Sequence, residues 1–132
     1  MFTIRPKSKD GILTFEIKDK TTQSVTDFYN VEPFPNYEAN ENKGSLLLKG
    51  DRNELSKKLK ELIGLNKSFI EIGSGTSQLS NYLAAGTNNN IVAFDPTEAA
   101  LRLGYDFATK NNINNVTFVN ADIFDDILQD EV

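Results

Sequence analysis

A glycine-containing segment near the middle of the chain, Lys67 to Tyr82 (KSFIEIGSGTSQLSNY), most constrains how this sequence can fold. Apolar residues from Phe69 to Ile72, interrupted only by Glu71, predict a buried strand that stops at two glycines. A helix-compatible stretch follows through Leu83. The pattern therefore predicts a strand, a tight turn and the start of a helix.

The two glycines suit a turn that binds a ligand with its main chain. Gly73 and Gly75 lack a Cβ atom and take positive φ angles readily, so a ligand can lie against the backbone. We expect the N–H groups of Thr76, Ser77 and Gln78 to point into a crevice at the positive end of a helix. The turn is therefore predicted to bind a nucleotide-like or anionic group.

The residues around the turn distinguish between two cofactor classes. A dinucleotide-binding turn has the pattern G-x-G-x-x-G, but here Gln78 occupies the third glycine position. Glu71, two residues before Gly73, would repel a pyrophosphate and would suit a ligand with an ammonium group or hydroxyl donors. A nicotinamide-dependent oxidoreductase therefore stays only an alternative interpretation.

Composition narrows the classes of function further. The 132 residues suffice for one domain, and 14 Lys and Arg residues against 19 Asp and Glu, without a basic patch, argue against a nucleic-acid partner. The absence of Cys and His excludes disulfides, a thiolate nucleophile, Cys/His zinc sites and an imidazole base, and we expect no metal site. Because no apolar leader or membrane-spanning run occurs, we expect a cytoplasmic protein.

The first 50 residues are predicted to form a hairpin and an irregular strap. Phe2 to Ile17 contains two short extended runs around Lys9-Asp10-Gly11, a turn signal, and we expect this hairpin to cover one edge of the domain. Thr21 to Gly50 is mostly polar, and its prolines prevent a helix from running through the FYNVEPFPNYE segment. Phe34 and Tyr37 on this strap either fill an apolar gap or form a lid over the ligand crevice.

Asp51 to Gly64 is the clearest helix in the sequence, and we place the start of the cofactor-binding half, residues 51–132, at its first residue. Asp51 and Glu54 have the spacing of an N-cap and N3 pair, and Gly64 supplies a stop. We expect its apolar stripe to cover the sheet and its lysines to face solvent; the stripe is Leu55, Leu59, Leu62 and Ile63, and the lysines are Lys57, Lys58 and Lys60.

A second strand and helix follow the glycine turn. A helix is predicted to about Ala85, and a strand from Ile91 to Phe94 then ends in Asp95, some twenty residues past Gly75. At this separation a carboxylate can accept hydrogen bonds from ribose hydroxyls. The alternative is that Asp95 caps the next helix, with Pro96 at its first position.

A third strand closes the pattern. The helix from Glu98 to Asn111 has a predicted buried face of Ala99, Leu103 and Phe107, and a strand from Val116 to Val119 follows it. Asp122 could accept from an adenine amino group while the N–H of Ile123 meets a ring nitrogen, or it could cap a following helix.

The alternation of strands and helices predicts an α/β fold, a Rossmann-like parallel sheet with flanking helices. The carboxyl ends of parallel strands meet at one edge of the sheet. We therefore expect the acids that follow the three strands, Glu71, Asp95 and Asp122, to lie side by side.

Three short motifs carry a family resemblance. EIGSGTSQLS, FDP and NAD are similar to the first three cofactor motifs of class I S-adenosylmethionine-dependent methyltransferases, with Ser77 where that family more often has glycine. The resemblance implies S-adenosylmethionine as cofactor. It implies that Asp95, with its neighbour Pro96, holds the ribose and that Asp122 and Ile123 hold the adenine. The methionine end would be held by Glu71, Gly73, Ser74, Gly75, Thr76, Ser77 and Gln78.

The resemblance also implies that the chain is a piece of a longer enzyme. In that family a fourth strand pairs beside the first and lines the methyl-transfer site, so we expect the catalytic residues beyond Val132 and an inactive chain in isolation. The glycine-bearing strand would then be a sheet edge through which two copies could associate. The alternative is a non-enzymatic module that binds a nucleoside or a partner. The sequence does not identify the methyl acceptor.

Overall fold

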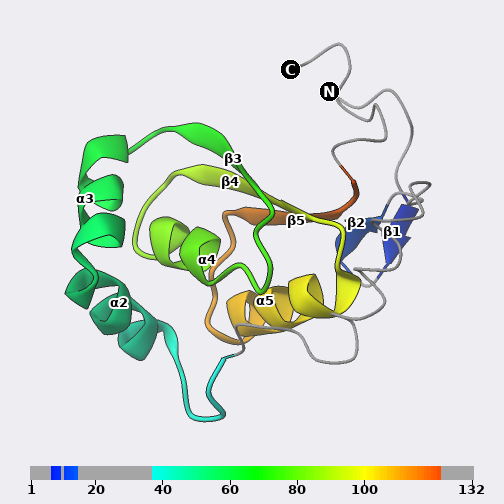
Figure 1. The fold of residues 1–132 in the computed structure, drawn as a ribbon, viewed down its shortest axis with the longest axis horizontal. Coiled ribbons are helices and arrows are strands. Elements are labelled where there is room, and N and C mark those ends of the chain that lie inside the picture. Colours follow the sequence, from blue (N-terminus) through cyan, green and yellow to red (C-terminus); the bar gives the residue numbers. More distant parts are fainter. Residues whose placement is uncertain (1–6, 10, 15–36, 123–132) are drawn as a thin grey trace.

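The computed structural model describes residues 7–9, 11–14 and 37–122, and it forms a sheet with helices against one side (Figure 1). Two short strands come first, β1 (Lys7–Lys9) and β2 (Ile12–Thr14). Helices α2 (Lys43–Arg52) and α3 (Glu54–Ile63) lead into strand β3 (Ser68–Ile72). The remaining elements alternate: α4 (Gln78–Ala84), β4 (Asn90–Asp95), α5 (Glu98–Lys110) and β5 (Val116–Asn120).

The sheet has the strand order β1-β2-β5-β4-β3. Strands β3, β4 and β5 are parallel, with Ile72 opposite Phe94 and Asp95 opposite Asn120. β2 runs parallel to β5, whereas β1 and β2 pair antiparallel as the predicted hairpin. The Rossmann-like parallel sheet is therefore confirmed, with the glycine-bearing strand β3 at one edge and the hairpin at the other.

The main core lies between the sheet and helices α4 and α5. Side chains from both layers are almost fully buried there, among them Tyr82, Leu83, Ile91, Leu101 and Phe118. On the opposite side of the sheet, a smaller cluster contains Phe94, Val119 and Ala121. The helices thus cover one face of the sheet that β3, β4 and β5 form.

Strand β3 is only half-buried, so the prediction of a buried strand was wrong. Phe69 packs against the main core and Glu71 reaches α4, but Ile70 and Ile72 point the other way and are 39% and 56% exposed. The cause is the edge position, because β4 covers β3 from one side only.

A helix takes up residues 43–50 of the expected strap, and it crosses the boundary that we placed at residue 51. Helix α2 begins after Asn42, whose side chain accepts from the Ser45 N–H while the Ser45 hydroxyl accepts from the Asn42 N–H. Asp51 lies inside α2 and accepts a hydrogen bond from the Tyr82 hydroxyl, so it caps no helix. The cap of α3 is Asn53, which accepts from two backbone N–H groups.

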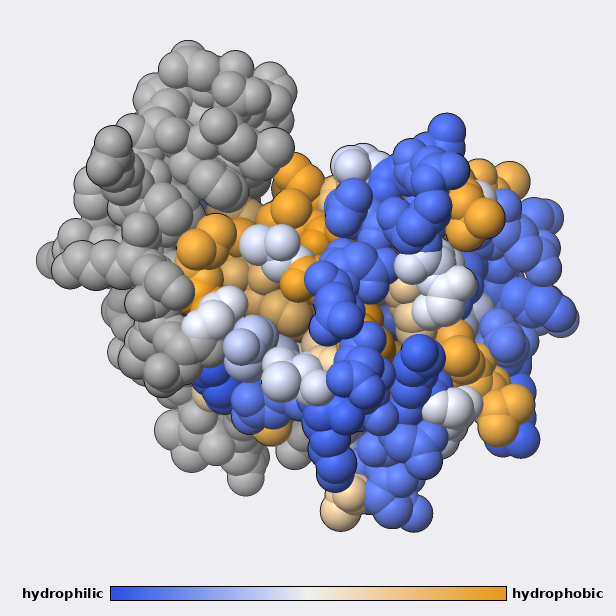
Figure 2. Space-filling model, turned by 180° about the vertical axis from the view of Figure 1, so that it is seen from behind, coloured by the Kyte–Doolittle hydropathy of each residue, from blue (hydrophilic) through white to orange (hydrophobic). Residues whose placement is uncertain are grey.

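Helix α3 does not cover the sheet with its leucines as predicted. Leu55 and Leu62 are 80% and 76% exposed, and no residue of α3 is fully buried. Figure 2 shows hydrophobic side chains among hydrophilic ones on the side of the molecule where α3 lies. Lys60, expected in solvent, instead donates from Nζ to the carbonyls of Tyr82 and Ala85, where α4 ends.

Helix α5 is confirmed in extent, but its buried face is rotated from the predicted one. Phe107 is buried as expected, whereas Ala99 and Leu103 are half-buried. The fully buried positions are Ala100, Leu101, Gly104, Phe107 and Ala108. Among the residues that the structure describes, no helix has the length and apolarity needed to cross a membrane.

Candidate functional site

The glycine turn joins the end of β3 to α4 and is tied to the neighbouring strand. Gly73 and Gly75 have φ angles of 72° and 57°, so the predicted positive φ angles are confirmed. The N–H groups of Gly73 and Ser74 both donate to the Phe94 carbonyl, at 2.7 and 3.1 Å. A Cβ atom added to Gly73 would meet nothing within 4 Å, so the space beside this glycine is open.

Ser77, the last residue of the turn, holds an unfavourable backbone conformation. Its φ of 62° and ψ of 30° are left-handed, which costs a non-glycine residue about 1–2 kcal/mol. Its N–H donates to the Ser74 carbonyl at 2.9 Å, and the two hydroxyls lie 2.9 Å apart. The Ser77 N–H therefore does not point into a crevice as predicted, because the turn itself uses it.

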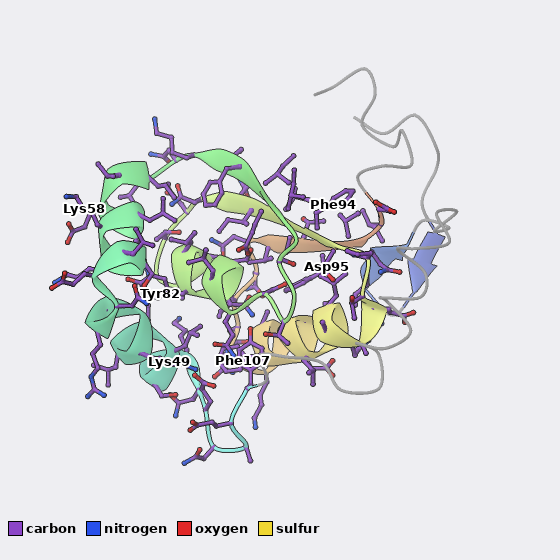
Figure 3. All side chains as sticks on the ribbon, viewed as in Figure 1. Lys49, Lys58, Tyr82, Phe94, Asp95 and Phe107 are labelled. Atoms are coloured by element: carbon purple, nitrogen blue, oxygen red, sulfur yellow. The ribbon has the colours of Figure 1, made fainter. Side chains whose placement is uncertain are left out.

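Asp95 connects the turn to the start of α5. Its Oδ1 accepts from the Gly75 N–H at 3.1 Å and its Oδ2 accepts from the Thr97 N–H at 2.8 Å. Asp95 is 8% exposed, and Figure 3 shows it where β4 ends. A carboxylate has about four acceptor positions, so these two bonds leave capacity for ligand hydroxyls.

The alternative role of Asp95 and Pro96 as cap and first residue of α5 is not observed. The N-cap of α5 is Thr97, and the helix begins at Glu98. Asp95 remains in β4 and reaches the helix only through the Thr97 N–H.

Glu71 lies in β3 opposite Ala93, two residues before Asp95 on the neighbouring strand, and it contacts α4. The Ser80 hydroxyl donates to its Oε1 at 2.5 Å. Burial raises the pKa of Glu71 above its ordinary value, the hydrogen bonds from Ser80 oppose this rise, and the negative charge of Asp95 adds to it. The influence of one carboxylate on the other agrees with their positions on neighbouring strands.

Asp122 follows β5 and is 3% exposed. Just before it, the Asn120 side chain and the Ala121 N–H both donate to the Asp95 carbonyl, each at 3.1 Å, so the ends of β4 and β5 are joined. Glu71, Asp95 and Asp122 therefore lie at the carboxyl ends of three adjacent strands, as the strand order requires. Ile123 and Phe34 lie outside the described residues.

Tyr37 contacts the turn through a connection that sequence reasoning missed. Its hydroxyl donates to the Thr76 carbonyl at 2.8 Å and accepts from Asn81 Nδ2 at 2.9 Å. Its ring stacks on Phe107 of α5 at 4.4 Å. This position agrees with an aromatic that fills a gap, while its action as a lid stays a prediction.

Gly104 of α5 and Asn81 of α4 also support the turn, and neither was singled out from the sequence. A Cβ atom at Gly104 would lie 2.6 Å from the Thr76 carbonyl oxygen and 2.9 Å from the Ser77 Cβ atom. Asn81 Nδ2 donates to the Gly104 carbonyl at 3.1 Å. For Gly104, a glycine inside a predicted helix was the available sequence signal, whereas the role of Asn81 depends on its burial in the fold.

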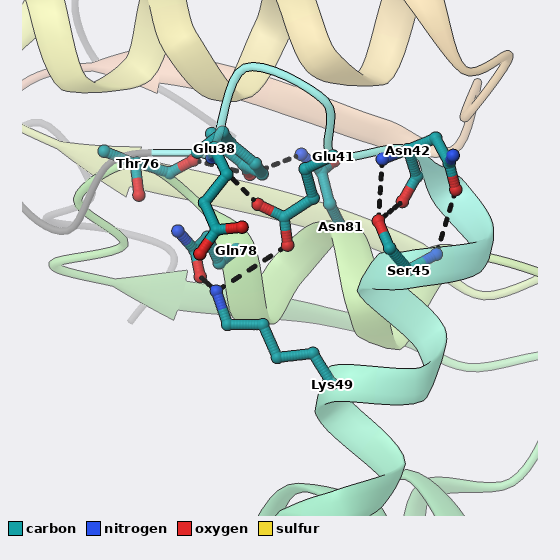
Figure 4. Close-up of polar contacts among 9 residues, drawn as sticks. Glu38, Glu41, Asn42, Ser45, Lys49, Thr76, Gln78 and Asn81 are labelled. Carbon is teal, nitrogen blue, oxygen red and sulfur yellow. Dashed lines mark hydrogen bonds and ion pairs between the residues drawn. The ribbon is translucent and has the colours of Figure 1, made fainter.

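Gln78 lies at the other border of the site, next to α2. Its Oε1 accepts from Lys49 Nζ at 3.2 Å, and the same ammonium lies 3.6 Å from Glu41 Oε1 (Figure 4). Gln78, Lys49 and Tyr82 are among the residues that line a cavity of about 220 Å³. Within the described ranges, His, Cys, Asp and Glu residues form no group of three or more that could hold a metal ion.

Comparison with known proteins adds a family match to this geometry. A family model described as a methyltransferase domain matches residues 63–132, more than half of the chain. A search of the curated proteins gives no match.

Three solved structures are similar to the chain. A candidate S-adenosyl-L-methionine-dependent methyltransferase from Methanococcus maripaludis is 19% identical, with a TM-score of 0.49 over 82% of this chain and 45% of its own. Precorrin-6y C5,15-methyltransferase from Geobacter metallireducens is 22% identical, with a TM-score of 0.46 over 60% and 43%. A SAM-dependent methyltransferase from Aquifex aeolicus is 19% identical, with a TM-score of 0.39 over 58% and 45%. The matched region spans less than half of each of these proteins.

Proposed function

The chain belongs to the methyltransferase domain family, whose model matches residues 63–132, and we propose that its glycine turn binds S-adenosylmethionine for methyl transfer. The observation that carries this proposal is the bond between Asp95 and the Gly75 N–H, at 3.1 Å. It joins the two parts expected to share one ligand, the turn after β3 and the acid at the end of β4. Their separation of twenty residues suits a ligand that lies across both strands.

The residues at the site fit this cofactor. The space beside Gly73 is open, so main chain and ligand can approach closely. Thr76 Oγ1 is buried and has no hydrogen-bond partner among the described residues, so a polar ligand group would satisfy it. Two carboxylates face the same end of the sheet, which suits a ligand with an ammonium group and ribose hydroxyls.

Each residue then has a binding task. Glu71 and the turn would hold the methionine end, where a carboxylate can pair with the ammonium group. Asp95, beside Pro96, would accept hydrogen bonds from the ribose. Asp122 would accept from the adenine amino group, with the Ile123 N–H on a ring nitrogen. When bound, the cofactor supplies a methyl group activated on a sulfonium, and these residues orient it.

The acceptor and the catalytic residues are not part of this proposal. The chain spans about 45% of the length of the first of these solved structures, so the activity of the complete protein is inferred from the family. A cytoplasmic location and self-association through the β3 edge stay predictions. A module that binds the nucleoside without transferring a methyl group is the alternative function of this chain in isolation.

Titration calorimetry with S-adenosylhomocysteine, the demethylated product, tests the proposal. We compare the wild-type chain with Asp95→Ala and with Asp106→Ala, an exposed acid on α5 that serves as the matched control. We expect Asp95→Ala to weaken binding about tenfold or more, because hydrogen bonds to a charged group are worth about 1.5–3 kcal/mol. Asp106→Ala should leave the affinity unchanged.

Two results would contradict the proposal. Equal affinities of the wild type and Asp95→Ala would remove Asp95 from the site. A larger rise in melting temperature with NAD than with S-adenosylmethionine would favour the oxidoreductase alternative instead.

A further inference from the structure

We infer that Tyr37, which precedes Thr76 by 39 residues, is a positioning residue of the cofactor site, acting through the Thr76 carbonyl. This inference rests on the proposed function. The Tyr37 hydroxyl donates to that carbonyl at 2.8 Å, and the residue after it, Ser77, is the strained one. Strained residues persist where the surroundings hold them in place.

The bond to the carbonyl sets the direction of a whole peptide group. The Thr76 carbonyl and the Ser77 N–H belong to one planar trans peptide, so they point in opposite directions. Tyr37 holds the carbonyl on one side, and the Ser77 N–H is thereby directed to the Ser74 carbonyl at 2.9 Å. Rotation of this peptide would break both bonds and release the turn from its present shape.

The Tyr37 hydroxyl is itself held from two sides. Asn81 Nδ2 donates to it at 2.9 Å, which leaves its proton for the Thr76 carbonyl (Figure 4 shows Thr76 and Asn81). The ring stacks on Phe107 at 4.4 Å with an interplanar angle of 17°. Burial raises the pKa of Tyr37, so the hydroxyl stays protonated and remains a donor at any physiological pH.

The Tyr37 hydroxyl is the donor that the described residues direct to the Thr76 carbonyl, at 2.8 Å. Gly104 lies close to the Thr76 carbonyl, because a Cβ atom added there would be 2.6 Å from its oxygen. Thr76 Oγ1 and Asn81 Oδ1 are buried without hydrogen-bond partners among the described residues. Loss of the Tyr37 hydroxyl would therefore leave the carbonyl without the donor that orients it, while the ring would still pack on Phe107.

The test compares Tyr37→Phe with Tyr105→Phe in the full 132-residue chain. Tyr105 is a matched control, because it is also a half-buried tyrosine whose ring contacts a phenylalanine. Its ring packs edge-on against that of Phe118, with the ring centroids 5.8 Å apart. Calorimetry with S-adenosylhomocysteine and with adenosine, which lacks the methionine end, separates a local effect at the turn from a general loss of stability. We expect Tyr37→Phe to weaken S-adenosylhomocysteine about tenfold and adenosine less than threefold, because the turn holds the methionine end. Tyr105→Phe should change neither.

Hydrogen exchange supplies a readout that does not depend on the ligand. In Tyr37→Phe, amides of residues 73–78 should exchange about tenfold faster, while those of β4 and α3 keep their wild-type rates. A second variant, Asn81→Ala, keeps the hydrogen bond from the Tyr37 hydroxyl to the Thr76 carbonyl but removes the Asn81 amide that donates to this hydroxyl. We therefore expect the amides of residues 73–78 to exchange faster than in the wild type, but by less than in Tyr37→Phe.

The outcomes are distinguishable. Binding and exchange in Tyr37→Phe within twofold of the wild type would overturn the inference, and so would equal weakening of both ligands. If the wild type binds no S-adenosylhomocysteine, the proposed function fails, and faster exchange restricted to the turn would still support the structural part of the inference. If Tyr37→Phe does not fold, unchanged exchange at residues 73–78 in Asn81→Ala would overturn it.

Discussion

Helix α3 and the glycine turn are close in the sequence, but they differ in burial: side chains of the turn are buried, whereas leucines of α3 are exposed. Thr76 and Ser77 in the turn are fully buried, and the turn is bonded to β4, α4 and Tyr37. On α3, Leu55 and Leu62 are mostly exposed, and Lys60 is the side chain that reaches α4. The comparison indicates that contacts among the described residues hold the carboxyl ends of the strands in place, whereas one side of α3 is exposed.

This difference suits a domain in which ligand binding requires a rigid turn. Strain at Ser77 is sustained only because contacts surround it. The exposed leucines and the β3 edge are an apolar surface without a partner among the described residues, and such surfaces favour association. Changes at the turn should therefore be costly, and changes on the open side of α3 should not.

The largest effect is expected from Gly104→Ala, which overpacks the tightly held region. The added Cβ atom would lie 2.6 Å from the Thr76 carbonyl oxygen, so α5 or the turn must move. We expect a loss of about 3 kcal/mol in the free energy of unfolding, measured by urea denaturation. Gly44→Ala, in helix α2, is the control, because its Cβ atom would meet only the Asn42 Oδ1 atom, at 3.2 Å, and its free energy of unfolding should change by less than about 1 kcal/mol. If Gly104→Ala and Gly44→Ala changed the free energy of unfolding by the same amount, the turn would tolerate the movement that the added Cβ atom requires.

Lys60→Met tests the hydrogen bonds that join α3 to the end of α4. The ammonium of Lys60 donates to two carbonyls where α4 ends and lies 4.4 Å from the centre of the Tyr82 ring. We expect a loss of about 1–2 kcal/mol by thermal denaturation, because the carbonyls lose their partner. Lys58→Met, on the exposed side, should stay within about 0.5 kcal/mol. A loss of the same size in Lys58→Met would mean that the cost arises from charge alone.

Glu71→Gln should alter how stability depends on pH. The folded protein raises the pKa of Glu71, so the unfolded chain loses this proton first as the pH rises. The folded state then binds more protons, and stability falls as the pH increases above the ordinary glutamate pKa. Glutamine does not titrate, so the variant should lack this fall, as measured by denaturation at several pH values. Parallel stability curves of the wild type and the variant across that range would contradict a raised pKa of Glu71 in the folded protein.

The smallest effect on stability is expected from the double variant Leu55→Lys, Leu62→Lys. Both side chains are mostly exposed, so the free energy of unfolding should change by less than about 0.5 kcal/mol. Sedimentation velocity should show less self-association than in the wild type, because the apolar surface becomes charged. A large destabilisation would mean that these leucines are buried in solution.

Local patterns predicted the elements between β3 and β5 well. The boundaries of β4 and α5 follow from apolar periodicity and from turn residues, and each of these signals involves only a few neighbouring residues. Helix α2 was missed because its start depends on an Asn42 and Ser45 pair, a less familiar capping pattern than Ser or Thr followed by Glu.

Strand topology accounts for the part of the site geometry that could be expected from the sequence, whereas side-chain packing supplied contacts that were not expected. Parallel strands bring Glu71, Asp95 and Asp122 to one edge whatever the side chains do. The contact between Tyr37 and Thr76 spans 39 residues, and the Asn81 and Gly104 contacts depend on how α4 and α5 approach the turn. No spacing rule predicts such contacts from sequence.

The most direct test of the central claim is a map of amide chemical-shift changes when S-adenosylhomocysteine is added to the chain. Binding across the carboxyl ends of the three strands predicts changes at residues 71–78, at Asp95 and at Asp122, with residues 54–63 of α3 unaffected. Changes confined to α3, or none at a saturating ligand concentration, would contradict the claim that the turn and its acids form the cofactor site.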